Sequence, residues 1–341
     1  MTWSAPTAAI PVNYSSRFFL YAPFGLLLLV GLATGARWWY AAGALETRLD
    51  AMQRGEAMPG VVVRYRTRSV GGFPFRLEAV LDDLSVQVAT ADGPIVWRAE
   101  HFALHGLTYG RNELIFEAAG KQSLAWGKGR HLDFQTGSLH ASAIQDEVGL
   151  SRFDLDLVAF DSPALAAGRI QFHIRRARDA LDIATSGEDV QLAPRLRGAF
   201  GDRVSLAALQ GDVSAARAFD GLRAGRADWR SAVEAWRRAQ GALHADPFEI
   251  NWSTLDMLAH GRIGLDDAKR PAGLLDVKIT GMPDWLARNP QTKPGGFAAA
   301  LRDRAAKAGA DQAGKMGVVL GARDGVVYLG DAPVGVVGAV Y

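Results

Sequence analysis

The sequence predicts an α+β fold that is mostly β: an N-terminal transmembrane helix followed by a long antiparallel, curved one-sided sheet, or β-groove, with a few packed helices. Three observations predict it. An uncharged apolar run lies near the N-terminus, short segments with alternating apolar and polar residues follow it, and two alanine-rich stretches have helical spacing. Because 49% of the 341 residues are hydrophobic, the chain has ample material for a packed core.

The apolar run extends from Phe18 to Ala36 and contains no charged residue. As a helix rising about 1.5 Å per residue, it is roughly as long as a bilayer's hydrocarbon core is thick. Its centre is the sequence Leu26, Leu27, Leu28, Leu29 and Val30, and its ends carry aromatic residues that include Phe19, Tyr21, Trp38, Trp39 and Tyr40. Aromatic rings prefer the headgroup level at both ends of a span. The sequence therefore predicts a transmembrane helix over residues 18–40, preceded by a cytoplasmic N-terminus over residues 1–17.

Two alternatives to an uncleaved anchor remain open at this point. A buried core helix has the same length, but it rarely carries aromatic residues at both ends. A cleaved signal peptide is the stronger alternative, because Ala33-Thr34-Gly35 and Ala42-Gly43-Ala44 both resemble small-residue cleavage sites. The long N-terminal region with a single basic residue, Arg17, favours the uncleaved anchor.

The orientation of the span does not follow from charge. Arg37, Arg48 and Arg54 follow the apolar run, whereas only Arg17 and the amino terminus precede it. Counted literally, the positive-inside rule places the large domain in the cytoplasm. Large domains, however, translocate largely regardless of charge, so the count alone does not decide the orientation.

A stalk helix and linker are predicted over residues 41–60, and a β-rich domain over residues 61–341. Leu45, Leu49 and Met52 recur with helical spacing in the stalk, and period-two alternation starts at Val61. Strands are expected at Leu81–Ala89, Ile95–Leu107, Glu113–Ala118, Gln122–Trp126, His131–Phe134, Ser138–Ala143, Phe153–Phe160, Arg169–Ala177, Leu181–Val190, Pro247–Trp252, Gly261–Leu265, Leu274–Thr280, Gly317–Leu320 and Val326–Leu329.

Helices are expected near residues 203–240 and 294–315. In the first stretch, Trp229, Val233 and Trp236 recur with helical spacing, which predicts an amphipathic helix over Ala227–Gln240. In the second, Phe297 and Leu301 form the apolar stripe with several alanines. Both helices are expected to lie against the sheet.

The sequence contains no recognisable catalytic, cofactor or metal site, so we expect no enzyme activity and no cofactor. Cysteine is absent, which removes thiolate nucleophiles and cysteine-based metal sites. His101 and His105 lie too far apart along one strand for an easy metal pair, and paired carboxylates such as Asp82-Asp83 and Asp266-Asp267 fit solvated strand ends. The balance of 38 basic against 36 acidic residues also makes nucleic acid an unexpected partner.

Two motifs stand out as structural. Gly71, Gly72, Phe73, Pro74, Phe75 and Arg76 place a rigid proline between two aromatics after paired glycines, which predicts a sharp turn into the following strand. We expect Phe73 and Phe75 to pack on opposite sides of that bend, with Phe75 in a core. The second motif extends from Asp324 to Gly330 and includes Gly325.

Placed after an anchor, these motifs resemble the alphaproteobacterial family called domain of unknown function 2125. Such proteins look distantly like AsmA-type envelope proteins, whose anchored β-grooves are associated with lipids. The resemblance implies a single-pass inner-membrane protein with a periplasmic C-terminal domain, and it implies no known catalytic residues. The resulting hypothesis is a lipid-binding or envelope-organising scaffold with membrane lipids and envelope proteins as partners. The alternatives are a protein-interaction module without lipid and, third, an envelope hydrolase.

Overall fold

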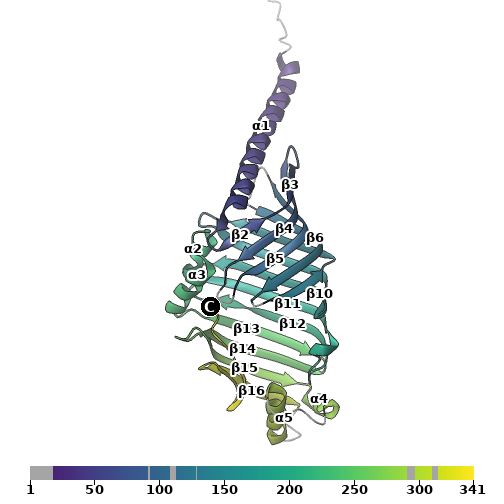
Figure 1. Cartoon of the computed structure of the whole chain (residues 1–341), viewed down its shortest axis with the longest axis vertical. Helices are drawn as coiled ribbons and strands as arrows, with labels where there is room; N and C mark the ends of the chain where they lie inside the picture. Colours follow the sequence, from purple (N-terminus) through teal and green to yellow (C-terminus); the bar gives the residue numbers. More distant parts are fainter. Residues whose placement is uncertain (1–17, 91–92, 108–112, 128, 290–295, 309–313) are drawn as a thin grey trace, which may run out of the picture.

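The computed structural model describes residues 18–90, 93–107, 113–127, 129–289, 296–308 and 314–341 (Figure 1). As predicted, the protein is mostly β, with one long antiparallel sheet and an N-terminal apolar helix. The expected cytoplasmic N-terminus, residues 1–17, lies outside the described residues.

The N-terminal helix α1 extends without interruption from Phe18 to Arg54, so the predicted anchor and stalk are one element. Its segment Tyr21–Arg54 is long and apolar enough to cross a membrane, and none of its apolar window is buried by the rest of the protein. The side chains of Leu26, Leu27, Leu28, Leu29 and Val30 are all exposed. This exposure argues against a core helix and leaves a membrane span or a signal anchor.

Eighteen strands form the sheet in the described part of the chain. The first eleven are β1 Glu56–Met58, β2 Val61–Arg64, β3 Thr67–Gly71, β4 Arg76–Val88, β5 Ile95–Leu107, β6 Glu113–Trp126, β7 Arg130–Gln135, β8 Ser138–Gln145, β9 Leu150–Asp161, β10 Leu165–Ala177 and β11 Ala180–Leu192. The others are β12 Arg203–Val213, β13 Leu243–Trp252, β14 Leu255–Leu265, β15 Pro271–Thr280, β16 Lys315–Arg323, β17 Val326–Leu329 and β18 Ala332–Val336. Most predicted strands coincide with strands in these ranges, but Glu113–Ala118 and Gln122–Trp126 are parts of the single strand β6. β4 and β14 start five and six residues earlier than predicted, and β1, β3 and β18 were not predicted.

The strands follow one another in an antiparallel meander. β4 pairs with β3 along its first half and with β2 along its last residues. β6 forks, because residues 113–118 pair with β8 while residues 121–126 pair with β7. From β8 to β18 each strand pairs with the next one in the chain. The result is one wide, curved sheet with α1 at one end of the molecule (Figure 1).

Short helices occupy two of the connections. Between β12 and β13 lie the 3-10 turn η2 Ala216–Phe219 and the helices α2 Asp220–Arg223 and α3 Trp229–Arg238; a further 3-10 turn, η1 Pro194–Leu196, precedes β12. Asp228 caps α3 by accepting a hydrogen bond from the Ser231 N–H at 2.8 Å. Between β15 and β16 lie α4 Met282–Arg288 and α5 Gly296–Ala308, at the end of the molecule opposite α1 (Figure 1).

The helix predictions need two corrections. The helix predicted near residues 203–240 is wrong over its first part. Arg203–Val213 forms strand β12, which pairs with β11 on one side and with β13 on the other. Its alanine and arginine content favours a helix locally, but the neighbouring strands determine the outcome. The predicted helix Ala227–Gln240 corresponds to α3, and α5 occupies part of 294–315, although Lys315 already belongs to β16. The short helix α4 was not predicted.

Helices cover the sheet at both ends. Leu45 and Leu49 of α1 pack on Ala79, Leu81 and Leu84 of β4. At the other end α4 and α5 bury a larger cluster, whose fully buried members include Ile279, Met282, Trp285 and Leu301. The turn into α4 needs glycine at Gly281, which has a φ of +81° and where an added Cβ would lie 1.7 Å from the Thr254 carbonyl oxygen.

Adjacent leucines of β15 provide a test of this core. Leu275 is 8% exposed and belongs to the buried cluster, whereas Leu274 is 62% exposed on the other face. We expect Leu275→Ala to lower the free energy of unfolding by about 2–5 kcal/mol, because it leaves a cavity. Leu274→Ala is expected to change it by about 0.5 kcal/mol or less. Melting in detergent micelles compares the two, and equal losses would contradict the assignment of faces.

Candidate functional site

Directly paired residues of an antiparallel sheet present their side chains on the same face. Following these pairs from β4 to β16, with β7 left aside, gives rows that cross twelve strands. The first row is Leu81, Phe102, Ala118, Leu139, Leu157, Ile170, Gly187, Ala207, Ile250, Met257, Ile279 and Met316. Every member is apolar or glycine.

Two further rows on the same face repeat this composition. The second is Ala79, Leu104, Phe116, Ala141, Leu155, Phe172, Thr185, Leu209, Phe248, Ala259, Val277 and Val318; the third is Leu77, Gly106, Leu114, Ala143, Phe153, Ile174, Ile183, Gly211, Ala245, Gly261, Leu275 and Leu320. The one polar member, Thr185, donates its hydroxyl hydrogen to the Gln171 carbonyl oxygen at 2.8 Å. We call the surface formed by these three rows the apolar face.

The opposite face of the same strands is polar. Ion pairs join neighbouring strands there: His173 lies 2.7 Å from Asp154, Arg169 lies 2.8 Å from Asp156, and His244 lies 3.1 Å from Asp212. These side chains alternate along each strand with members of the apolar face, as a sheet with one dry and one wet side requires. The sheet is therefore one-sided, as the sequence predicted.

The apolar face is covered unevenly. α1 packs on it at β4, and α4 and α5 pack on it from β14 to β16. In the central strands, the side chains of Leu155, Ile170, Phe172 and Ile183 remain partly exposed although strands flank them on both sides. Apolar side chains in the middle of a sheet that no second layer buries mark a candidate binding surface.

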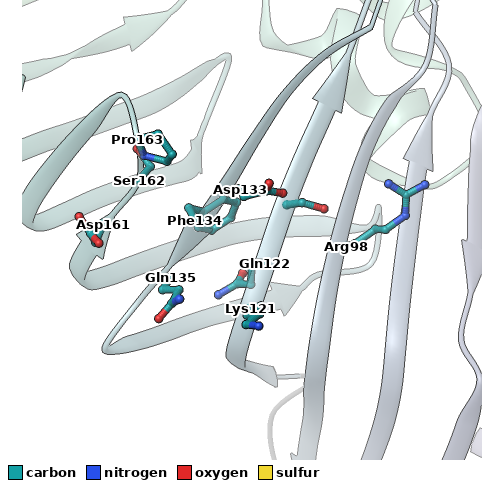
Figure 2. A pocket seen from close by; sticks show the side chains of 10 residues that line it. Arg98, Lys121, Gln122, Asp133, Phe134, Gln135, Asp161, Ser162 and Pro163 are labelled. Carbon is teal, nitrogen blue, oxygen red and sulfur yellow. The ribbon is translucent and has the colours of Figure 1, made fainter. Parts of the chain in front are cut away.

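A separate polar pocket of about 740 Å³ lies at the fork of β6 (Figure 2). Arg98, Lys121, Asp133 and Asp161 line it, and none of these four makes an ion pair with another described residue. The Ser162 hydroxyl nearby donates to the Leu165 carbonyl oxygen at 2.8 Å, which closes the turn between β9 and β10. Two cations and two carboxylates in one open pocket favour no particular ligand charge.

The carboxylates singled out in the sequence are held by ordinary structural contacts. A hydrogen bond from the Thr67 hydroxyl, together with one from His101, lowers the pKa of Asp82 below its usual value. A hydrogen bond from the Arg270 backbone N–H lowers the pKa of Asp266. Carboxyls with lowered pKa values stay ionised near neutral pH and are poor proton donors there. His105 pairs with Glu117 at 3.7 Å, and no group of three or more His, Asp or Glu among the described residues has the arrangement of a metal site.

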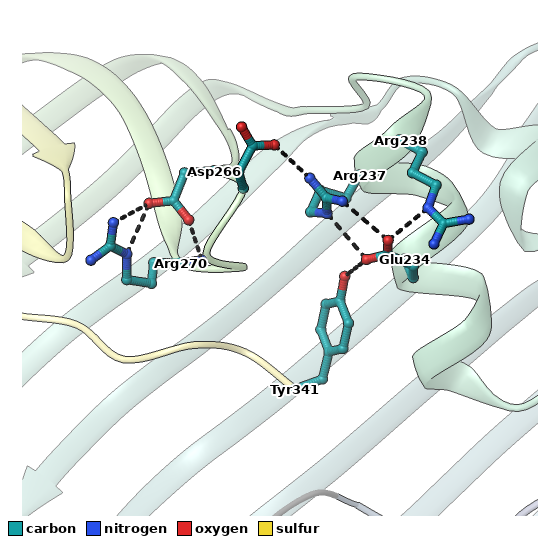
Figure 3. A network of polar contacts seen from close by, with 7 residues as sticks. Glu234, Arg237, Arg238, Asp266, Arg270 and Tyr341 are labelled. Carbon is teal, nitrogen blue, oxygen red and sulfur yellow. Dashed lines mark hydrogen bonds and ion pairs between the residues drawn. The ribbon is translucent and has the colours of Figure 1, made fainter.

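A network around Glu234 of α3 holds distant segments together (Figure 3). Its carboxylate accepts hydrogen bonds from Arg237 at 3.1 Å, from Arg238 at 2.7 Å and from the Tyr341 hydroxyl. Arg237 also reaches Asp267, at 2.9 Å, in the turn between β14 and β15. These hydrogen bonds, first that from Arg237, hold the pKa of Glu234 well below its usual range. The network fixes the chain's last residue to the helical connection between β12 and β13.

The two sequence motifs lie at different ends of the strand order. Gly325 and Gly330 occupy the turns on either side of β17 with φ values of +78° and +60°. Gly71 to Arg76 form the turn between β3 and β4, beside α1. The expectation that Phe75 packs in a core is wrong, because Phe73 is 59% and Phe75 58% exposed. The strand register that assembles the apolar face could not be predicted from the sequence, because it depends on which residues of neighbouring strands lie opposite one another.

The Glu234 network predicts sensitivity to acid. A carboxyl whose pKa is lower in the folded chain than in the unfolded one, about 4.3 for Glu, stabilises the fold above that value and loses this effect as the pH falls toward the folded pKa. We expect the melting temperature to drop below about pH 4.3. The Glu234→Gln variant should have a lower melting temperature than the unaltered chain at pH 7, and its melting temperature should fall less on acidification. The control is Glu147→Gln, at an exposed residue between β8 and β9 for which the described residues provide no ion pair; it should behave like the unaltered chain, and identical acid profiles for all three would contradict the prediction.

Comparison with known proteins agrees with the motifs. A family model described as an uncharacterized protein conserved in bacteria, DUF2125, matches residues 38–337. The match covers most of the chain, from Trp38 near the end of the apolar part of α1 to the residue after β18, and it contains both motifs. No curated protein sequence matches the chain. The chain thus belongs to the DUF2125 family of uncharacterized bacterial proteins.

Proposed function

We propose that the protein is a non-catalytic, lipid-binding scaffold, anchored in the inner membrane by α1, whose apolar face holds acyl chains on the periplasmic side. The observation that carries the proposal is the continuity of the apolar face. Its rows start on β4, the strand on which α1 packs, and continue strand by strand to β16. Acyl chains that leave water for such a surface gain about 0.8 kcal/mol per buried CH₂.

The size of the apolar face suits long apolar ligands. Eleven steps between neighbouring strands, at about 4.8 Å each, give a path of roughly 50 Å from β4 to β16. This path exceeds the roughly 30 Å of a bilayer's hydrocarbon core. The helices α1, α4 and α5 cover the two ends of this path, so the part open to acyl chains is the partly exposed centre around Ile170 and Phe172.

Adjacent residues of β10 test lipid binding without truncating the core. Ile170 belongs to the apolar face and Gln171 to the polar face, and both are partly exposed. With a photoreactive amino acid at each position in the full chain, we expect crosslinks to phospholipid at 170 and none at 171. Mass spectrometry of the irradiated protein detects them. Absence of lipid at both positions, or equal labelling at both, would overturn the proposal.

The proposed orientation has its own test. The support for a periplasmic domain is the family resemblance together with the readiness of large domains to translocate regardless of flanking charge. Alkaline phosphatase joined through a flexible linker after Tyr341 should be active, and a fluorescent protein that matures only in the cytoplasm should stay dark there. An inactive phosphatase with a bright fluorescent fusion would place the domain in the cytoplasm.

A further inference from the structure

The turn between β3 and β4, residues 71–76, is tight and directs two aromatic rings outward. The Arg76 N–H donates to the Gly72 carbonyl oxygen at 3.1 Å. Gly72 has a φ of +92°, and an added Cβ would lie 2.6 Å from the Arg76 carbonyl oxygen, so the turn requires glycine there. More than half of the surface of Phe73 and of Phe75 is exposed. Two large exposed aromatics on one short turn call for an explanation, because the pair contributes little to the core.

The turn lies against α1 at a defined height. The Trp38 indole N–H donates to the Arg76 carbonyl oxygen at 2.8 Å, and the Trp38 and Phe73 rings meet edge to face with centroids 5.3 Å apart. A Cβ added to Gly35 would lie 3.7 Å from the Phe73 ring. Figure 1 shows β3 rising beside α1 at the end of the sheet nearest that helix.

This height is where a membrane span would leave the bilayer. The uncharged run of α1 ends at Ala36, and the exposed aromatics Trp39 and Tyr40 follow. Aromatic residues at the end of a span lie at the headgroup level. If α1 crosses the membrane, Phe73 therefore lies at the boundary between acyl chains and headgroups.

We propose that the β3–β4 turn inserts Phe73 and Phe75 into the surface of the bilayer that α1 crosses, as a second membrane contact. The proposal rests on the membrane anchor of the proposed function but not on lipid binding by the apolar face. Exposed aromatic rings gain free energy by entering the headgroup boundary, and the exposed Arg76 guanidinium, 3.1 Å from Glu78, suits the level of lipid phosphates.

The contact would also place the apolar face at the membrane. Leu77, the first member of the third row, follows the turn directly; it pairs with Gly106 of β5, which in turn pairs with Leu114 of β6. The third row then begins at the bilayer surface. An acyl chain moving from the bilayer to the apolar face would meet apolar side chains from the first step.

A single-cysteine label tests the contact, because the chain contains no cysteine of its own. Gly71 suits the label, since its φ is not in the left-handed region and an added Cβ has open space. Val336, 84% exposed on β18, is the control site. Full-length Gly71→Cys and Val336→Cys, each carrying an environment-sensitive fluorophore, are reconstituted into phosphatidylglycerol–phosphatidylcholine vesicles with or without lipids nitroxide-labelled high on the acyl chain.

We expect blue-shifted emission and nitroxide quenching for the label at position 71 and neither effect at position 336. Adding Phe73→Ser and Phe75→Ser to Gly71→Cys should remove most of the quenching at an unchanged melting temperature. Quenching at 71 as weak as at 336, or undiminished by the two serines, would overturn the proposal. If the serine variant does not fold, the comparison of positions 71 and 336 decides alone. Crosslinking at Ile170 is independent of this outcome, so the two proposals fail separately.

Discussion

The register of strand pairing is the constraint on which the rest of the structure depends. Side chains alternate along a strand, so a slip of one residue would turn all its apolar side chains to the wet side. In several strands apolar and polar side chains do not alternate regularly, and local irregularities of the backbone return the apolar side chains to the dry face. Leu81 and Leu84 of β4 both lie in the buried cluster although they are three positions apart, and Asp83 between them has a φ of +52°. On β13, a shift between Ala245 and Phe248 keeps both on the apolar face.

Much of this sheet could be predicted from the sequence, because alternation is a local signal. The strand Ile95–Leu107 was expected with the boundaries that β5 has. The strand Arg203–Val213 was missed, because its alanines carry little strand preference and only pairing with β11 and β13 places it. The seven-residue helix α4 was missed as well, since it is too short to establish a helical period.

The candidate site was harder to predict than the elements that form it. Alternation in RFDLDLVAF shows that Leu155 faces one way and Asp154 the other, but not which residues lie opposite on β8 and β10. Phe75 was assigned to a core because Phe73 and Phe75 were expected to pack on opposite sides of the bend at Pro74. In the structure Phe75 is exposed, on a turn that a hydrogen bond from Trp38 to the Arg76 carbonyl oxygen holds against α1. That contact joins residues 38 positions apart, so no local pattern predicts it.

The order of the strands also bears on how the protein is made. Apart from the fork at β6 and the two partners of β4, each strand pairs with its predecessor in the chain, so the sheet can grow strand by strand as synthesis proceeds. Most of these steps are hairpins, whereas the connections before β13 and β16 are longer and contain helices. Hairpins close short loops and form quickly, whereas distant strands must wait for each other. Because α1 is made first, the sheet would assemble from the helix outward, with each new strand completing the exposed edge left by the last. Assembly in this order keeps the number of unpaired edges small throughout, which lowers the risk of aggregation for a chain that pairs so many strands.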